Sequence, residues 1–124
     1  MSDEPVPEDV RELILRHIDS VAQLEALLFF RARPGESWQS GSVAKRLYAP
    51  AGEMTRSLES LCNAGFLRRD SSAYLYDCSA ENQVTVDRLA TAYARYLIPI
   101  TNLIHSKPRN IKAFADAFKF RRDE

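Results

Sequence analysis

The sequence predicts a mostly α-helical chain that carries one small β-hairpin and ends in a long helical extension. Two observations lead to this fold class. Apolar residues recur at spacings of three and four along most of the chain, which is the period of an amphipathic helix. By contrast, residues 66–70 and 74–78 alternate around the polar turn at residues 71–73, which is typical of a hairpin. With 124 residues, of which 45% are hydrophobic and 27% charged, the chain can build the core of one domain.

The N-terminal part predicts a lead-in followed by two helices. Residues 1–7 are acidic, contain two prolines and show no periodicity, so we expect a flexible lead-in before a first helix that starts at residue 8. A capping box opens the second helix: Ser20 is expected to accept from the Gln23 N–H, while the Gln23 side chain reaches back to the Ser20 N–H. Pro34 and Gly35 end this helix, because the residue before a proline disfavours helical backbone.

The middle of the chain predicts a short extended segment and a pair of helices. The extended segment falls at residues 37–38, and the helices fall at about residues 40–48 and 50–64. Pro50 closes the first of these helices and can occupy the first position of the next. Gly65 is expected to end the second helix in the left-handed conformation and to turn the chain into the hairpin.

The C-terminal extension predicts two apolar stripes. The first has spacings of 3, 4, 3, 4 and 3 residues, which is typical of a heptad seam, and Pro99 is expected to kink its helix. The second follows Pro108 in a tail rich in phenylalanine and basic residues. We expect these stripes to dimerise or to dock on the core, with insertion of the tail into another protein as the alternative. The candidate residues are Val86, Leu89, Tyr93, Tyr96, Ile100, Leu103, Ile111, Phe114 and Phe118.

Charge is balanced overall and uneven along the chain. Lysine plus arginine equal aspartate plus glutamate at 17 each, which argues against a general electrostatic binder of nucleic acid or membrane but not against a local basic patch. Residues 1–19 carry a net charge of −4, and residues 107–124 carry +3. The acidic start and the basic end could therefore meet, within one chain or between two.

Several classes of chemistry have no motif in this sequence. No nucleophile elbow, phosphate loop or paired catalytic carboxylates appear, so we expect no enzyme activity and no cofactor. Cys62 and Cys78 form no C-x-x-C pair and the two histidines form no H-x-x-x-H pair, so no metal site is predicted. A redox role of Cys78 and a small-effector pocket at Tyr93 and Tyr96 are minor alternatives. Without a secretory signal or an apolar run near the ~20 residues of a membrane helix, we expect a cytoplasmic protein with reduced thiols and no membrane insertion.

The predicted order of elements resembles a known domain. Residues 21–76 read as helix, short strand, helix, helix and hairpin, and a long helix follows. The segment L-x-x-L-x-x-x-G-F-L, residues 58–67, is the most specific part, because its leucines anchor a helix and its glycine turns the chain into the hairpin. This pattern resembles the winged helix-turn-helix domain, and within it the MarR-like and PadR-like bacterial transcriptional regulators. The resemblance divides the chain into a lead-in (1–7), a winged-helix domain with an extra N-terminal helix (8–78) and a helical extension (79–124).

The resemblance implies an interface with double-stranded DNA. In such regulators the third helix of the domain enters the major groove, and basic residues of the hairpin, called the wing, touch phosphate. By position, the DNA-binding candidates are Ser42, Lys45, Arg46, Thr55, Arg56, Ser57, Ser60, Asn63, Arg68 and Arg69. Residues 20–78 carry a net charge of only +1, and Glu53 and Glu59 share the third helix with Arg56. A module so weakly basic must dimerise or bind weakly. We therefore expect a homodimeric DNA-binding transcriptional regulator, with a winged-helix protein-interaction adaptor that does not bind DNA as the alternative.

Overall fold

The computed structural model describes residues 6–107, which form six helices and three short strands. The predicted fold class, mostly helical with one small hairpin, is confirmed at this level. In chain order the elements are α1 (Glu8–His17), α2 (Val21–Arg31), β1 (Trp38–Gln39), α3 (Ser40–Leu47), α4 (Ala51–Asn63), β2 (Leu67–Asp70), β3 (Ala73–Tyr76), α5 (Ala80–Arg95) and α6 (Leu97–His105).

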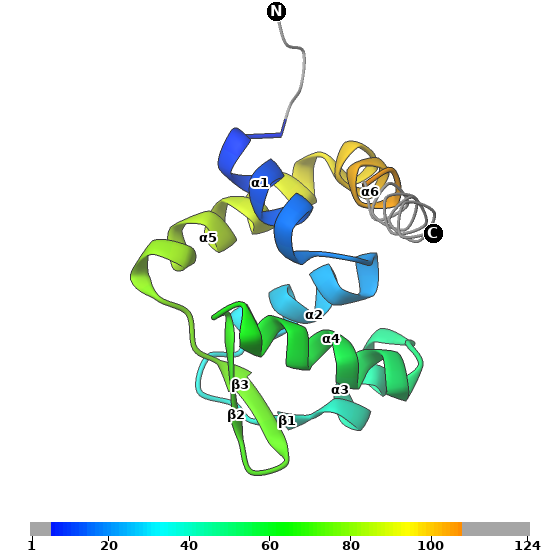
Figure 1. The fold of residues 1–124 in the computed structure, drawn as a ribbon, viewed down its shortest axis with the longest axis vertical. Coiled ribbons are helices and arrows are strands. Elements are labelled where there is room, and N and C mark those ends of the chain that lie inside the picture. Colours follow the sequence, from blue (N-terminus) through cyan, green and yellow to red (C-terminus); the bar gives the residue numbers. More distant parts are fainter. Residues whose placement is uncertain (1–5, 108–124) are drawn as a thin grey trace, which may run out of the picture.

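The elements gather into two groups that meet at α2 (Figure 1). Helices α1, α5 and α6 pack against one another at one end of the molecule. Helices α3 and α4 pack together at the other end, where α4 also contacts β2 and α2 contacts β3. The predicted DNA-contacting elements therefore share one end of the molecule, away from α1 and α6.

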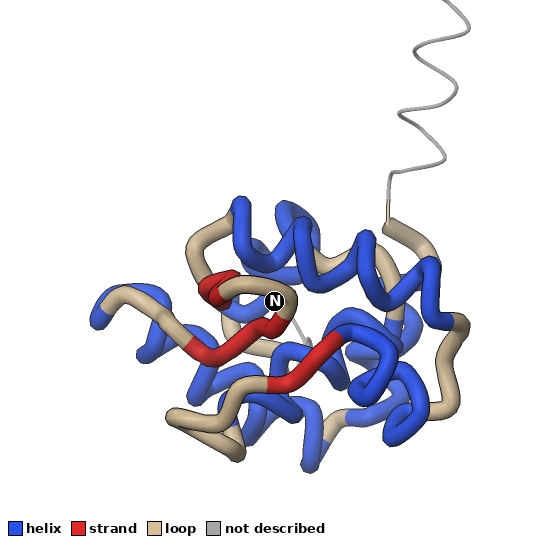
Figure 2. Tube along the Cα trace, turned by 90° about the horizontal axis from the view of Figure 1, so that it is seen from below, coloured by secondary structure: helices blue, strands red, loops and turns tan. Residues whose placement is uncertain are grey.

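The sheet is antiparallel, with the strand order β1-β3-β2. The predicted hairpin forms, with Leu67 opposite Tyr76 and Asp70 opposite Ala73. The predicted extended segment is displaced by one residue and becomes β1, which adds to the free edge of β3 through the pair of Trp38 and Tyr74. Figure 2 shows these strands from their own end of the molecule.

Two of the predicted helix ends are confirmed, one of them only in part. The Ser20 Oγ accepts from the Gln23 N–H at 3.0 Å, as the capping box requires. The Gln23 Oε1, however, accepts from the Asp19 N–H at 2.7 Å and not from Ser20, so this half of the prediction is wrong by one residue. The cause lies on α4, because the Gln23 Nε2 donates at 3.2 Å to the Ser57 carbonyl and this contact fixes the direction of the amide. Gly65 has φ of 91° and ends α4 in the predicted left-handed conformation.

The long C-terminal helix breaks rather than kinks. The break lies at Tyr96, where φ is −128° and ψ is 54°, three residues before Pro99. A proline ring clashes with the carbonyl of the residue four positions earlier, which here is Arg95, the last residue of α5. Pro99 then occupies the first turn of α6, where a backbone N–H has no partner within the helix.

The apolar seam of the extension packs into the chain's own core. Val86, Leu89 and Ile100 are each 0% exposed. They belong to one core cluster with Val10 and Ile14 of α1, which contacts both α5 and α6. These three residues are thus covered within a single chain and do not face a partner.

The other extension candidates divide into two sets. Tyr93, Tyr96 and Leu103 are half-buried and pack against the core. The hydroxyl of Tyr93 donates at 2.8 Å to Glu25 Oε2, which ties α5 to α2. Burial of the hydroxyl, together with this hydrogen bond, raises the pKa of Tyr93 to about 12. The second set, Ile111, Phe114 and Phe118, lies outside the described residues.

Candidate nucleic-acid interface

Helix α4 has one buried face and one outer face. Met54, Leu58 and Leu61, spaced four and three residues apart, are at most 1% exposed and fix the buried face. Arg56 and Asn63 lie on the opposite side, and both are exposed. A helix held along one face with the other free has the form needed to enter a groove.

The remaining candidates on α4 have other surroundings. Thr55 is half-buried: its hydroxyl lies 2.9 Å from the Ser40 hydroxyl and donates at 3.1 Å to the Ala51 carbonyl, which joins α4 to the start of α3. Ser57 and Ser60 are also half-buried, and with Arg56 they line a shallow cleft between α4 and the start of α2. Of the five candidates on α4, only Arg56 and Asn63 are exposed.

Helix α3 places all three of its candidates at the surface. Ser42, Lys45 and Arg46 are exposed, and both bases lie in its last turn. The Arg46 guanidinium lies 5.4 Å from the ring of Trp38 and 5.8 Å from that of Phe29, within the range of a cation–π contact. Lys45 makes no ion pair or hydrogen bond within residues 6–107, so its ammonium is free to meet an anion.

Each basic residue of the β2–β3 hairpin lies beside an acid. Arg68 Nη1 is 3.1 Å from Asp77 Oδ2, and Arg69 Nη1 is 3.7 Å from Glu59 Oε2 on α4. The side chains of these two pairs are all at least half exposed. Such exposed pairs contribute only about 0–1 kcal/mol each, so a phosphate can compete for either arginine.

The outer surface of this end of the molecule is therefore mixed in charge. Lys45 and Arg46 lie on α3, Arg68 and Arg69 lie on the hairpin, and α4 itself carries Arg56. Glu53 and Glu59 are exposed on the same helix and interrupt the basic surface. This arrangement suits weak, salt-sensitive contact with a polyanion better than tight binding.

Sequence reasoning missed one residue of this surface. Tyr48, in the turn between α3 and α4, is 96% exposed and has left-handed backbone, with φ of 57° and ψ of 46°. A signal was available, because the chain must stop a helix between Leu47 and Pro50 without a glycine. The spacing of apolar residues does not reveal a left-handed residue that ends a helix.

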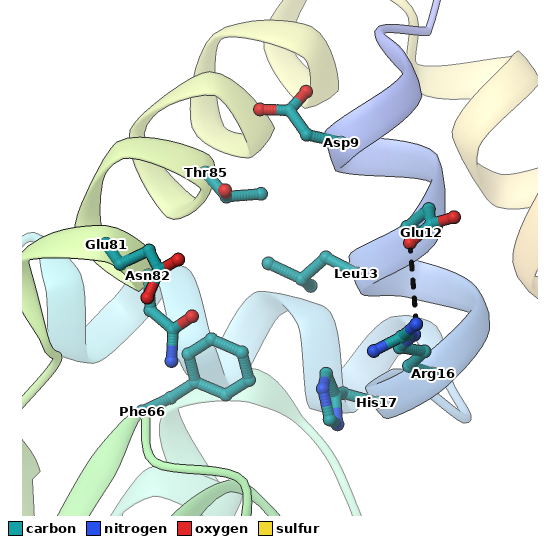
Figure 3. A pocket seen from close by; sticks show the side chains of 9 residues that line it. All are labelled: Asp9, Glu12, Leu13, Arg16, His17, Phe66, Glu81, Asn82 and Thr85. Atoms are coloured by element: carbon teal, nitrogen blue, oxygen red, sulfur yellow. Dashed lines mark ion pairs between the residues drawn. The ribbon is translucent and has the colours of Figure 1, made fainter.

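A second cleft lies at the other end of the molecule, between α1 and α5 (Figure 3). His17 of α1 packs edge-on against Phe66, with the ring centroids 5.4 Å apart. Burial lowers the pKa of His17, and the charges of Arg16 and Lys107 lower it further. Two carboxylates of the cleft lie on facing helices, Glu12 on α1 and Glu81 on α5. The Glu12 carboxylate lies 3.8 Å from Nη2 of Arg16 on its own helix. Nothing in this geometry pairs a nucleophile with a base.

The surroundings of the two cysteines do not activate their thiols. Cys62 and Cys78 are free and half-buried, and burial raises the pKa of both thiols, which disfavours the reactive thiolate.

Within residues 6–107, no three side chains of histidine, cysteine, aspartate or glutamate come close enough together to hold a metal ion. In the same part of the chain, no helix combines the length and the apolar character needed to cross a bilayer.

Neither a scan against protein-family models nor a search of curated protein sequences finds a match for this chain.

Proposed function

We propose that this chain is a small DNA-binding transcriptional regulator that uses a winged helix-turn-helix and acts as a homodimer. The order of elements from α2 to β3 supports the fold assignment, because a helix, a strand, two helices and a hairpin follow one another and β1 joins the edge of β3. The contact of α3 with α4 supports a helix-turn-helix unit, in which the second helix enters the major groove.

The observation that carries the DNA-binding proposal is the outer face of α4 with its basic flanks. Arg56 and Asn63 are exposed on that face, and Lys45 on α3 and Arg69 on the wing stand on neighbouring elements. Arginine and asparagine are side chains that read base edges, whereas lysine and arginine at the flanks suit phosphate. The assigned roles follow: Arg56 and Asn63 face bases, and the flanking bases face the backbone.

A homodimer would compensate for the weak charge, because two-fold symmetry doubles the number of phosphate contacts. The seam residues are buried within the chain, so a second copy must meet other apolar surface. Leu97 and Ile98, at the start of α6, are 49% and 64% exposed and lie next to the half-buried Tyr96. We assign the contact between copies to this part of α6.

The DNA proposal is tested by titrating a labelled random-sequence duplex at salt concentrations from about 50 to 200 mM. The double change Arg68→Ala, Arg69→Ala should lower the slope of log K against log salt by about one unit per lost phosphate contact. The matched control is Arg16→Ala, Arg88→Ala, since these arginines are also exposed and paired with acids but lie on α1 and α5. The proposal fails if wild type binds no duplex at low salt, or if the control lowers the slope equally.

The dimer proposal is tested by sedimentation at micromolar protein. Ile98→Glu places a charge on an exposed site, so the chain should fold and the dimer should dissociate. A wild-type monomer at high micromolar protein would contradict the dimer proposal and leave DNA binding to be judged by the titration.

One observation favours the second candidate, a protein-interaction adaptor. Glu59 and Asp77 already neutralise the wing arginines, as expected of a surface that never meets phosphate. Glu59→Gln separates the two functions. If the surface binds DNA, this change removes a carboxylate that repels the phosphates and frees Arg69 from its ion pair, so duplex affinity should rise. An adaptor should show no duplex binding with or without the change.

A further inference from the structure

Tyr48 occupies a backbone position that suits glycine. Its φ of 57° lies in the left-handed region, where a bulky side chain is rare. The Ala49 N–H donates to the Ala44 carbonyl at 2.9 Å across this residue, which is the six-residue closure of a Schellman turn. Glycine is the usual residue at the left-handed position of that turn, because it has no Cβ to crowd the backbone.

The Tyr48 side chain makes no contact that would offset this strain. The ring is 96% exposed, the most of any large hydrophobic side chain in residues 6–107. Within the same residues, its hydroxyl makes no hydrogen bond and its ring stacks on no other ring or cation. A strained residue without internal contacts points to a use outside the folded chain.

The position of Tyr48 indicates which kind of partner it meets. It lies in the turn between α3 and α4, three residues after Lys45 and three before Ala51, where α4 begins. In a helix-turn-helix the first helix crosses the DNA backbone and the N-terminal residues of the second reach the base edges. The turn between them therefore lies at the rim of the groove, where a tyrosine hydroxyl can donate to a phosphate oxygen.

We propose that Tyr48 is a DNA-backbone contact, with its ring against a deoxyribose and its hydroxyl donating to the adjacent phosphate. The inference rests on the proposed DNA-binding function and adds to it a residue that charge alone would not identify. A tyrosine carries no charge near neutral pH, so its contact releases no counterion. Tyr48 should thus add affinity at every salt concentration without adding to the salt slope, whereas Lys45 should add to both.

The test combines thermal unfolding with the duplex titration on four single variants. Tyr48→Gly should raise Tm by about 4 °C, because the strain is relieved, and should weaken duplex binding about tenfold with an unchanged salt slope. Tyr48→Phe should leave Tm unchanged and weaken binding about fivefold through loss of the hydroxyl. Lys45→Ala should lower the slope by about one unit. Val84→Ala is the control, since Val84 is a 54% exposed apolar residue on α5, and it should leave binding unchanged.

Opposite changes in Tm and affinity for Tyr48→Gly distinguish a binding role from a structural one. A lower Tm for that variant would overturn the inference, because it would show that the ring supports the fold. Binding within twofold of wild type would also overturn it, and the proposed function would stand because wild type still binds. If wild type binds no duplex at low salt, the proposed function itself fails and the inference fails with it.

Discussion

Lys107 should be a major contributor to the stability of this fold, because its ammonium is buried against the end of α1. Its side chain is only 7% exposed, and its Nζ donates to three acceptors at the end of α1. The distances are 2.6 Å to the Ile18 carbonyl, 2.9 Å to Asp19 Oδ1 and 3.1 Å to the Ile14 carbonyl. An ammonium at the C-terminal end of a helix also lies where the helix dipole favours positive charge.

The magnitude follows from what remains when the ammonium is removed. Lys107→Met keeps most of the buried stem and removes the ammonium group with its three hydrogen bonds. The Ile14 carbonyl keeps the Ile18 N–H at 3.0 Å, but the Ile18 carbonyl loses its ammonium donor in a residue that is 0% exposed. A buried carbonyl left without a partner costs about 1–3 kcal/mol, and a charge-assisted bond contributes about 1.5–3 kcal/mol. These two figures overlap, so we expect a loss of about 2–3 kcal/mol.

The assay is thermal unfolding of the full chain. For a domain of this size 1 kcal/mol shifts Tm by about 4 °C, so Lys107→Met should lower Tm by roughly 8–12 °C. The matched control is Lys45→Met, which removes an exposed ammonium near the end of another helix and should shift stability by no more than about 0.5 kcal/mol. A Tm within about 2 °C of wild type for Lys107→Met would refute the reasoning, because desolvation of the ammonium would then offset its bonds.

Three further predictions concern other parts of the chain. Gln23→Leu should cost about 1–3 kcal/mol in a urea melt, since it removes the hydrogen bonds that the buried Gln23 amide makes to the Ser57 carbonyl and to the Asp19 N–H. A midpoint equal to that of wild type would contradict this. The pKa of His17 is lower in the folded state than in the unfolded state, so the unfolded state binds more protons and stability should fall as pH drops from about 7 to about 5. His17→Gln should therefore flatten this part of the plot of Tm against pH. A plot as steep as that of wild type would contradict this. Deleting residues 108–124 while retaining Lys107 should lower Tm if the apolar stripe of the tail docks on the core. An unchanged melting curve together with loss of a protein partner would favour the protein-interaction adaptor instead.

Local features of this protein followed from the sequence because their causes lie within a few residues. Ser20 caps the residue three positions later, and Gly65 takes the left-handed turn that its missing Cβ allows. The hairpin at residues 67–76 follows from alternation around a polar turn. The exposed candidates Arg56 and Asn63 also followed, because the spacing of the leucines on α4 defines which side of the helix is left outside.

The partners of each surface were decided by the tertiary structure alone. A heptad spacing predicts an apolar face but does not say what covers it, and here α1 covers Val86, Leu89 and Ile100 within one chain. Composition counts Arg69 and Glu59 as separate charges, but the packing of β2 against α4 brings them to 3.7 Å and weakens the basic surface. The Lys107 bond to Ile14 joins residues 93 positions apart. Neither propensity nor periodicity can report such contacts, because both describe neighbours along the chain, whereas burial and ion pairing depend on neighbours in space.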